Sequence, residues 1–588
     1  MANHKDTGQK SQDFNPVSSS PRQKNKSKGL DDIEWIVQHR EDEIHELRQA
    51  IENFSILVRA ATLSPVPVNL TDFYKRFKQM KPCLHRQCNN YDVIDIAAQV
   101  YSLQRLPFEI TQKESVYIQK EPKRASTVEG IKRLSCGTRR RAAYDLGKTI
   151  EFVALEGETD IFDIMTCLTM YGIEASKIRR KLASSPLREE LRTLVEGDNL
   201  SLENKNQIYA RLANVFGITF EKLTFADKSL NGRYFEILNN ILSTDPNNLQ
   251  VEFDSGFSLT DASPKAKNWN ERICKKLADY SNRPIAIISS DTHSVVNCLT
   301  GFALENKSEI IERAKNHPEL TELEPNNPSV VYFLLQDLCR MPENRDLLER
   351  KIQYEKGVGV KVVRDKWDTG VDVQIIDTSK ILSHMDKIDP RIKREGLFDR
   401  GLVIINMDYS FGKQGTYNLS ELCNSLGNRI ESISIMGKAG ITCGNRFDIM
   451  IPSYIIPQIN GGPYEFPDPN RLCANDFDGL LTDQRVHSSG PMLTVPGTAM
   501  QNELVLYYYI HNYGILGLEM EAGPYLEAVI KAEKKGVIND NIRLNIGYWA
   551  SDNPLNPGET LAESHMEKGS IPSYALNLAI LNKILRNE

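Results

Sequence analysis

Apolar residues recur at steps of three and four along much of the first 245 residues of the chain. Charged residues separate the apolar positions between Asp31 and Phe54, and similar patterns cover Val93–Leu103, Ile161–Tyr171 and Asn206–Phe216. This spacing places apolar side chains on one face of an α-helix. The pattern therefore predicts a mostly helical region in the first part of the chain.

From about residue 283 short apolar runs appear, the first of them at Ile285–Ile288. Further strands are predicted at Val360–Val363, Val371–Ile376, Leu402–Met407, Ile433–Met436, Asp448–Pro452, Ile515–Met520 and Ile542–Tyr548, with helices at Asn502–Asn512 and Pro572–Leu585. Strands that alternate with helices and Gly-rich turns are typical of an α/β sheet. We therefore expect the α/β class, with an α/β domain over residues 396–588. A mostly helical region of one or two subdomains, regulatory or oligomerising, precedes it over residues 30–395.

Composition narrows the class of protein. A chain of 588 residues with 40% apolar and 26% charged residues is typical of a soluble protein of two or three domains. No run approaches the roughly 18–20 apolar residues that span a bilayer, and the N-terminus lacks a signal-peptide pattern. Ten scattered cysteines favour reduced thiols, so we expect a cytoplasmic protein with no membrane partner. Residues 1–29 are polar and are predicted to be disordered.

Three polar clusters have alternative interpretations. Cys83, His85 and Cys88 resemble half of a metal site, but no second pair follows, so no metal is predicted. The turn Ser289–His293 between a strand and a helix pattern fits helix capping by Ser or Asp better than anion binding. The run Arg139–Arg141 indicates a solvated face or a contact to a phosphate or another subunit. The net charge of −6 makes nucleic acid an unfavoured partner.

Two carboxylates stand at predicted strand ends in the last third of the chain. Glu521 directly follows one strand, and Asp552 follows the next strand along the chain. Ligands of open α/β sheets bind outside the carboxyl ends of strands, so the two acids are candidates for polyol binding and proton donation. The alternatives are that Glu521 is a helix-start acid and that Asp552 is a turn residue.

The order of motifs around these acids is specific. It runs from Gly437–Gly440 through the strand Asp448–Pro452 to Glu519-Met520-Glu521-Ala522 and then Ser551-Asp552. This order resembles the nucleoside phosphorylase and nucleosidase superfamily, which includes purine nucleoside phosphorylase, methylthioadenosine/adenosylhomocysteine nucleosidase and AMP nucleosidase. The resemblance covers residues 400–588. It implies a three-layer α/β domain that cleaves an N-glycosidic bond and forms a homo-oligomer.

The resemblance also implies roles for individual residues. Met520 would pack on the sugar, Glu521 would bind the ribose hydroxyls, and Glu519 belongs to the same substrate-binding motif. Asp552 would donate a proton or hydrogen bond to N7 of a purine, with Ser551 orienting it. A carboxylic acid there would neutralise the negative charge that develops on the departing base.

The first two loops depart from the family pattern. Lys438, next to Gly437, stands where the family usually offers a hydroxyl to phosphate, and a lysine binds phosphate as a point charge. In the loop after Leu402–Met407, Gly412 would suit phosphate binding, whereas Asp408 would activate water in a hydrolase. The residues do not decide between these roles.

The function expected from the sequence is hydrolysis of the N-glycosidic bond of a purine nucleoside or nucleotide, like that of AMP nucleosidase. A phosphate-dependent phosphorylase and a non-catalytic nucleotide sensor are the alternatives. No cofactor is expected, although inorganic phosphate would be the cosubstrate of a phosphorylase. An α-helical RNA-binding protein is the weakest alternative.

Overall fold

The structure is a computed structural model. It describes residues 30–588 except 83–84, 86, 138, 140, 156, 197–201, 255–261, 318–325, 367, 460–462, 467–468 and 557–568. The predicted disordered tail, residues 1–29, lies outside the described residues.

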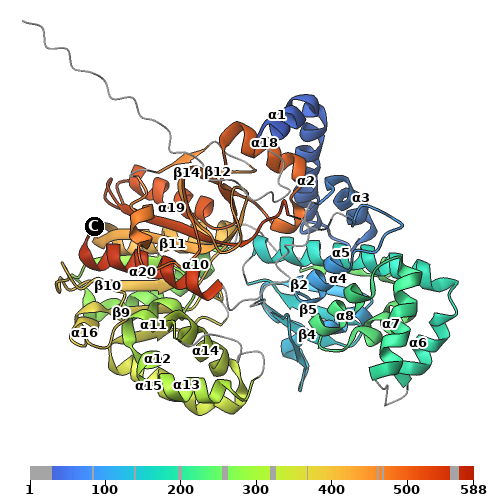
Figure 1. Cartoon of the computed structure of the whole chain (residues 1–588), viewed down its shortest axis with the longest axis horizontal. Coiled ribbons are helices and arrows are strands. Elements are labelled where there is room, and N and C mark those ends of the chain that lie inside the picture. The colour runs from blue at the N-terminus through green and yellow to red at the C-terminus, as the bar shows by residue number, and fades with distance from the viewer. Residues whose placement is uncertain are drawn as a thin grey trace, which may run out of the picture.

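The described N-terminal part contains a sheet of six strands in the order β1-β6-β2-β5-β4-β3 (Figure 1). Its strands are β1 Val68–Asn69, β2 Ser115–Gln119, β3 Arg133–Leu134, β4 Ala142–Leu146, β5 Thr149–Val153 and β6 Gln250–Phe253. Its helices are α1 Leu30–His39, α2 Glu41–Ala61, α3 Thr71–Met80, α4 Ile96–Leu103, α5 Glu158–Ala183, α6 Leu187–Glu196, α7 Leu202–Phe216, α8 Phe220–Ser229 and α9 Tyr234–Ser243. The helices agree with the predicted helical pattern. The sheet was not predicted, because strands of two to five residues are too short to give a clear alternation.

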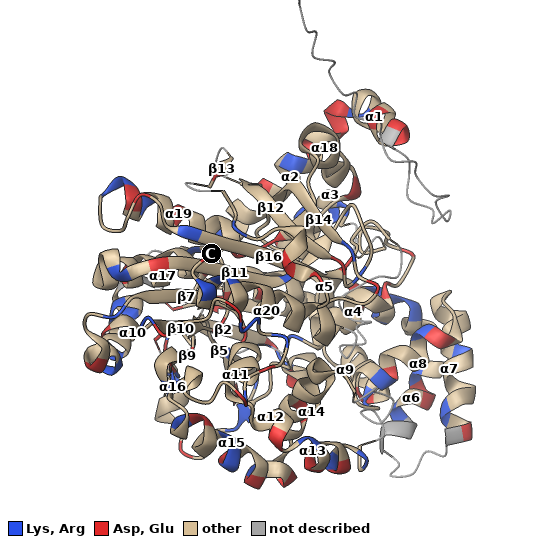
Figure 2. Cartoon of the chain, turned by 60° about the vertical axis from the view of Figure 1, so that its left-hand side comes forward, with Lys and Arg blue, Asp and Glu red and all other residues tan. Residues whose placement is uncertain are grey.

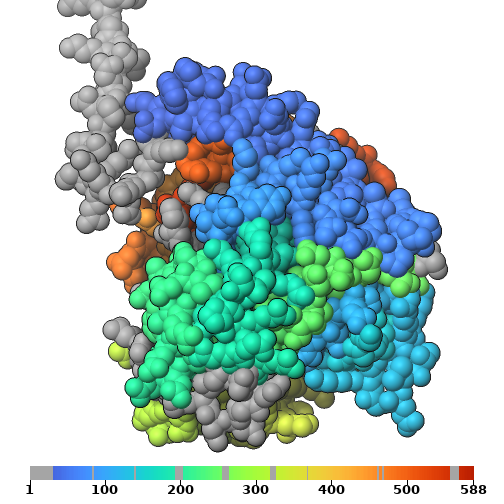
Figure 3. Space-filling model, turned by 90° about the vertical axis from the view of Figure 1, so that its right-hand side faces the viewer, coloured from blue at the N-terminus to red at the C-terminus, as the bar shows by residue number. Residues whose placement is uncertain are grey.

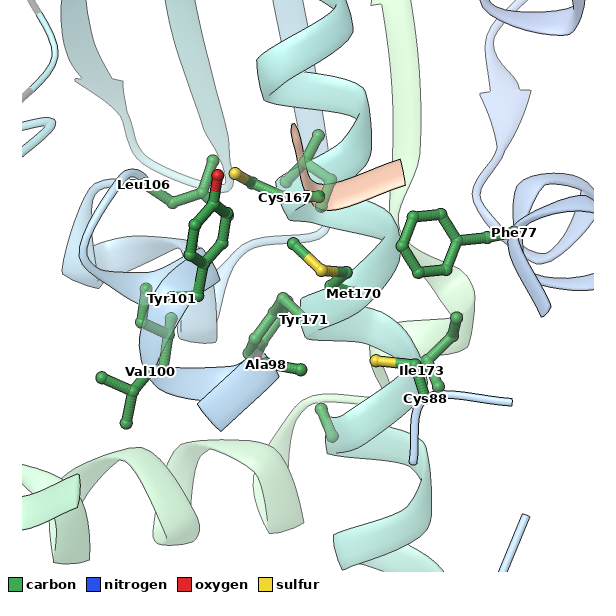
Figure 4. Close-up of a cluster of buried hydrophobic side chains, with 14 of the residues drawn as sticks. Phe77, Cys88, Ala98, Val100, Tyr101, Leu106, Cys167, Met170, Tyr171 and Ile173 are labelled. Carbon is green, nitrogen blue, oxygen red and sulfur yellow. The ribbon is translucent and has the colours of Figure 1, made fainter. Parts of the chain in front are cut away.

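Helix α5 is the centre of the N-terminal core. It packs against α2, α3, α4 and α9, so apolar residues cover most of its circumference. In Figure 4 Cys167, Met170 and Tyr171 of α5 gather with Tyr101 of α4, whose hydroxyl lies beside the Cys167 sulfur. Phe77 of α3 packs on another side of the helix. A helix buried on several sides is held in a fixed position by its neighbours.

The rest of the chain forms a second sheet of ten described strands. Its order is β13-β12-β14-β15-β11-β7-β10-β9-β8, and β16 pairs with both β11 and β12. The strands are β7 Ile285–Ser289, β8 Val360–Val363, β9 Val373–Asp377, β10 Val403–Met407, β11 Ile430–Ile441, β12 Ile449–Pro457, β13 Tyr464–Glu465, β14 Val486–Thr494, β15 Gly517–Glu519 and β16 Arg543–Asp552. Strands β10, β7, β11 and β16 run parallel to one another, so their carboxyl ends lie on the same edge.

Helices cover both faces of this sheet. They are α10 Ala262–Leu277, α11 Ser294–Thr300, α12 Phe302–Glu305, α13 Lys307–Ala314, α14 Pro328–Arg340, α15 Arg345–Gly357, α16 Thr378–Leu382, α17 Gly412–Leu426, α18 Glu503–Tyr513, α19 Ala522–Lys534 and α20 Ser570–Arg586. One apolar cluster joins α10, α17 and α19 to the sheet, and a separate cluster joins α11, α14 and α20 to it. The predicted α/β class is confirmed.

The predicted domain boundary at residue 396 falls inside this sheet. Strand β10 pairs with β7 on one side and with β9 on the other, and both neighbours precede the boundary in sequence. All five residues of β10 are buried, so the strand requires partners on both sides. The sheet therefore begins near residue 285, and a boundary at 396 is wrong.

The two parts of the molecule share one core. Helix α18 packs against α1 and α2, and residues from Ile456 to Leu518 join the apolar cluster of the N-terminal part. The side-chain amide of Asn502 donates hydrogen bonds to the carbonyl oxygens of Met80 and Lys81, at 3.2 and 2.8 Å. Figure 3 shows C-terminal residues, in orange, beneath the blue N-terminal helices. This packing places α5 next to the strand ends of the second sheet.

Candidate functional site

The stretch Gly437–Gly440 lies within strand β11 and is not a turn after it. The pairing of β11 with β16 continues to Gly440, opposite Asp552, and Gly440 also pairs with Leu518 of β15. The predicted strand end at Met436 is therefore wrong, because partners on both sides extend the strand. Gly437 and Lys438 consequently lie in the middle of the sheet.

Lys438 is the exposed residue in an otherwise buried or half-buried strand. It makes no hydrogen bond or ion pair with another described residue. Surrounding protein atoms displace water and lower the pKa of Lys438, and the charges of Arg105 and Arg139 lower it further. The charges of Asp552 and Glu521 act in the opposite direction. One lysine is thus close to both acids predicted from the sequence and to two arginines of the N-terminal part.

Glu519, the last residue of β15, holds the turn into α19. Its Oε2 accepts hydrogen bonds from the backbone N–H groups of Glu521 and Ala522, at 2.5 and 2.6 Å, and from the Tyr548 hydroxyl at 3.1 Å. The hydroxyl of Thr494 donates to its other oxygen. A carboxylate at the first turn of a helix also interacts favourably with the helix dipole. Glu519 therefore positions Glu521 by accepting a hydrogen bond from its backbone N–H.

Glu521 has fewer hydrogen bonds with its surroundings. Its Oε2 accepts from the backbone N–H of Met520 at 3.1 Å, and the residue is only 5% exposed. Burial raises the pKa of Glu521 to about 8, and the neighbouring Glu519 adds to this rise, whereas Lys438 counteracts it. Glu521 therefore retains its proton near neutral pH.

The absence of a side chain at Gly437 leaves space beside the carboxyl group of Glu521. A Cβ on Gly437 would lie 2.9 Å from the ring of Tyr548 and 3.7 Å from Oε1 of Glu521. Any larger residue would thus displace the tyrosine ring and approach the carboxyl group.

Asp552 is the last residue of β16, and it is buried together with Ser551. The Ser551 hydroxyl donates a hydrogen bond to Asp552 Oδ1 at 2.6 Å and lies 3.2 Å from the carbonyl oxygen of Ala439. These contacts fix the orientation of the Asp552 carboxyl group. The sequence placed Asp552 after a strand, but pairing with β11 extends β16 to include it.

The end of β10 lies near the same acids. Asp408 Oδ1 accepts the backbone N–H of Tyr409 at 2.8 Å. Burial raises the pKa of Tyr409, and the charges of Asp291, Glu521 and Asp408 contribute to the rise. Tyr409, which the sequence did not assign to the site, therefore lies near both Glu521 and Asp291. Gly412 begins α17 with a φ of 53°, and a Cβ there would approach Thr159 Oγ1 of α5 to 2.7 Å.

The turn before α11 is a helix cap. Asp291 Oδ1 accepts the backbone N–H groups of His293 and Ser294, at 2.9 and 2.6 Å. The prediction of capping by Ser or Asp is confirmed, with Asp291 as the capping residue.

A cavity of about 80 Å³ lies between α5 and the strand ends. It is lined by Tyr101, Arg139, Arg141, Thr159, Asp160, Phe162, Asp163, Thr166, Cys167, Phe411, Pro496, Gly497, Thr498, Ala499, Met500 and Met520. A second hollow, which Gly412 and Tyr464 line, shares Met520 with the first. Met520, which the resemblance predicts to pack on the sugar, thus faces the N-terminal part of the chain.

The cavity wall contributed by the N-terminal part is charged. Arg139 contacts both oxygens of Asp163, at 2.6 and 3.1 Å, and Arg141 lies 2.7 Å from Asp163 and 3.5 Å from Asp160. Burial raises the pKa of Asp163, but the two arginines outweigh it and hold the pKa at about 2. In Figure 2, by contrast, basic and acidic residues alternate over outer helices such as α13 and α15. Arg140 lies outside the described residues.

The metal half-site of the sequence is not assembled in the part that the structure describes. Cys83 lies outside the described residues, and His85 and Cys88 are buried. No group of three or more described His, Cys, Asp or Glu residues is placed to hold a metal ion. Of the described helices, none has the length and apolar character to cross a membrane.

Residues 70–586 match the family described as "Family of unknown function (DUF6909)", and the protein therefore belongs to that family. No curated protein matches the chain.

Solved structures resemble parts of the chain. One is the 5′-methylthioadenosine/S-adenosylhomocysteine nucleosidase of Campylobacter jejuni, with 9% identity, 52% of this chain and 100% of that chain covered, and a TM-score of 0.30. A futalosine hydrolase mutant of Helicobacter pylori shows 9% identity, coverage of 52% and 99%, and a TM-score of 0.27. A methylthioadenosine phosphorylase from an antarctic soil metagenomic library shows 11% identity, coverage of 32% and 74%, and a TM-score of 0.24.

Proposed function

We propose that this protein hydrolyses the N-glycosidic bond of a purine nucleoside or nucleotide. The observation that carries the proposal is the position of Lys438, whose charge interacts with both Glu521 and Asp552. Two acids that follow separate strands thus lie near one lysine of the sheet, and α/β proteins bind ligands at strand ends. The motif order that resembles the nucleosidases supplies the class of substrate.

Asp552 is proposed as the acid that assists departure of the base. Cleavage leaves negative charge on the purine, and a proton or hydrogen bond at N7 neutralises it. The hydrogen bond from Ser551 holds Asp552 Oδ1 in place. A fixed donor of this kind stabilises the transition state more than the bound substrate.

Glu521 is proposed to bind the ribose hydroxyls, with Met520 packing on the sugar. Because its pKa is high, Glu521 holds its proton when no ligand is bound. It would ionise as it accepts hydrogen bonds from the two hydroxyls of a ribose, since such hydrogen bonds favour the charged form. Asp408, beside Tyr409 at the end of β10, is the candidate to activate water.

A chromatographic assay of free base tests the proposal. We expect wild-type protein to release base from at least one purine nucleoside or nucleotide in phosphate-free buffer. Asp552→Asn should reduce the rate by about 100-fold or more, in the range for general acids, because the amide keeps the shape but has no proton to transfer. The exposed residue Asp540 provides the matched control, and Asp540→Asn should leave the rate unchanged.

A phosphorylase is the second candidate, and Lys438 is the observation that favours it. A lysine that makes no hydrogen bond or ion pair with another described residue suits an inorganic phosphate nucleophile. Release of base only when phosphate is added, with ribose 1-phosphate as the second product, would replace hydrolysis by phosphorolysis. Ligand binding without release of base in either buffer would instead indicate a sensor.

A further inference from the structure

We propose that Cys443, His487 and Asp448 form a reactive-cysteine site in which a small hydroperoxide oxidises the Cys443 thiol to a sulfenic acid. Cys443 lies in the loop after β11, Asp448 directly precedes β12, and His487 belongs to β14, which pairs with β12. None of the three residues takes part in the proposed cleavage of the N-glycosidic bond, so the inference goes beyond the proposed function.

The loop after β11 holds Cys443 at the surface. The residue is exposed, whereas the loop around it is bound to the end of β16. The side-chain amide of Asn553 donates a hydrogen bond to the carbonyl oxygen of Gly444 at 3.2 Å, and Arg446 Nε donates to the carbonyl oxygen of Ser551 at 3.0 Å. The thiol is therefore accessible to a small molecule while its backbone is held in place.

Asp448 orients His487 against this loop. Asp448 is 3% exposed, and its Oδ2 accepts hydrogen bonds from His487 Nε2 at 2.9 Å and from the backbone N–H of Asn445 at 3.0 Å. A Cβ on Gly444 would lie 2.5 Å from His487 Nε2 and 2.7 Å from Asp448 Oδ2. The residue next to Cys443 thus lies directly against the pair. A carboxylate bound to one ring nitrogen fixes the orientation of a histidine and favours its charged form.

His487 also contacts the sulfur of Cys443, which lies 3.6 Å from the carbonyl oxygen of Leu516 as well. Hydrogen bonds to Asp448 and to Cys443 raise the pKa of His487 to about 9, so its ring is positively charged at neutral pH. A histidine cation next to a cysteine stabilises the thiolate, which is the nucleophilic form.

A second exposed cysteine has the opposite environment. The Cys473 thiol donates a hydrogen bond to Asp476 Oδ2 at 3.3 Å. A carboxylate beside a sulfur disfavours a second negative charge there. Exposure alone would make the two cysteines similarly reactive, whereas their neighbours predict that Cys443 reacts faster.

A hydroperoxide fits this arrangement because its reduction needs a thiolate and a proton donor at the same point. After the Cys443 proton has passed to solvent, the thiolate attacks the terminal oxygen of the hydroperoxide. The S–O bond forms as the O–O bond breaks, so the sulfur is oxidised by two electrons and the peroxide is reduced. His487 gives its proton to the departing oxygen, which leaves as water or as an alcohol.

Peptide mass spectrometry of the full-length protein tests the site. Hydrogen peroxide is the oxidant, and dimedone traps the sulfenic acid. Cleavage after Lys and Arg places Cys443 in the peptide of residues 439–446 and Cys473 in that of residues 472–485, so one sample reports both. We expect Cys443 to be labelled at least about tenfold faster than Cys473.

A variant of the histidine separates its two roles. His487→Gln should lower the rate of oxidation at Cys443 by about tenfold or more and leave the rate at Cys473 unchanged. Alkylation by iodoacetamide needs the thiolate but no proton donor, because iodide leaves unprotonated. The variant should therefore slow alkylation of Cys443 less than its oxidation. The exposed His511 provides the matched control, and His511→Gln should change neither rate.

Two results would overturn the inference. One is equal labelling of Cys443 and Cys473 in the wild-type protein, which requires no variant to fold. The other is a wild-type ratio of oxidation to alkylation rates at Cys443 in His487→Gln. Labelling uses no nucleoside, so its failure leaves the proposed function intact, and a failure of base release leaves the cysteine site intact.

Discussion

Replacing Glu519 by Gln should loosen the turn that carries Met520 and Glu521. The Glu519 carboxylate is 2% exposed, and its Oε2 accepts two backbone N–H groups and the Tyr548 hydroxyl. A glutamine oxygen in the same place keeps these three contacts but makes them neutral. Its amide group faces the hydroxyl of Thr494, which can rotate to accept a hydrogen bond.

The magnitude follows from the loss of charge. A hydrogen bond to a charged group contributes about 1.5–3 kcal/mol, and a neutral one about 0.5–1.5 kcal/mol. Three such contacts predict a loss of about 3 kcal/mol for Glu519→Gln. Glu519→Ala should lose more, because the N–H groups of Glu521 and Ala522 would be left without an acceptor.

Hydrogen–deuterium exchange read by mass spectrometry measures this locally. Peptides over residues 515–530 should exchange about 100-fold faster in Glu519→Gln, the factor that about 3 kcal/mol implies when exchange follows local opening. Tyr548→Phe, which removes a single hydroxyl from the cluster, should accelerate exchange by only about fivefold. Unchanged exchange in Glu519→Gln would refute the assignment of Glu519 as the group that holds this turn.

Three further predictions concern pH and space. Folding raises the pKa of Glu521 from 4.5 to about 8. The stability that this group contributes is therefore fully present below pH 4.5 and is lost as the pH rises through 8. Glu521→Gln should remove this contribution from the profile of melting temperature against pH. Hydrogen bonds to Asp448 and Cys443 raise the pKa of His487 from 6.5 to about 9. The stability that they contribute is present below pH 6.5 and is lost as the pH rises through 9. If His487→Gln left the profile of melting temperature against pH unchanged between pH 6.5 and 9, the pairing of His487 with Asp448 would be contradicted. Gly437→Ala should lower the rate of base release by about tenfold or more, because its Cβ would displace Tyr548 beside Glu521; a wild-type rate would show that the space is not used.

The sequence predicted the α/β class and the positions of most described strands because their apolar runs are continuous. The predicted strand lengths were wrong where pairing with neighbouring strands extends a strand. Strand β11 continues through Gly437–Gly440 only because β15 and β16 pair with it there. The short strands of the N-terminal sheet, such as β1 and β3, carry too few residues for a readable alternation.

The sequence predicted some residues of the candidate site but not the contacts between distant parts of the chain. Glu521 and Asp552 lie near one another for a reason that the sequence did not predict: β16 runs parallel to β11 as far as Asp552, whereas β15 runs antiparallel to β11, so its carboxyl end points back towards Gly437. The approach of Arg139 and Arg141 to Met520 depends on packing between residues far apart in sequence, which no local pattern encodes. The backbone contacts of Glu519 likewise follow from the geometry of one turn, and the motif alone suggested a substrate ligand.

The most direct test of the account is the amount of free purine base released by wild-type protein from a panel of nucleosides and nucleotides in phosphate-free buffer. The account predicts base and free sugar, or sugar phosphate from a nucleotide, in equal amounts, with the rate of release reduced by about 100-fold or more in Asp552→Asn. Absence of base from every substrate, for a folded wild-type protein with and without phosphate, would contradict it.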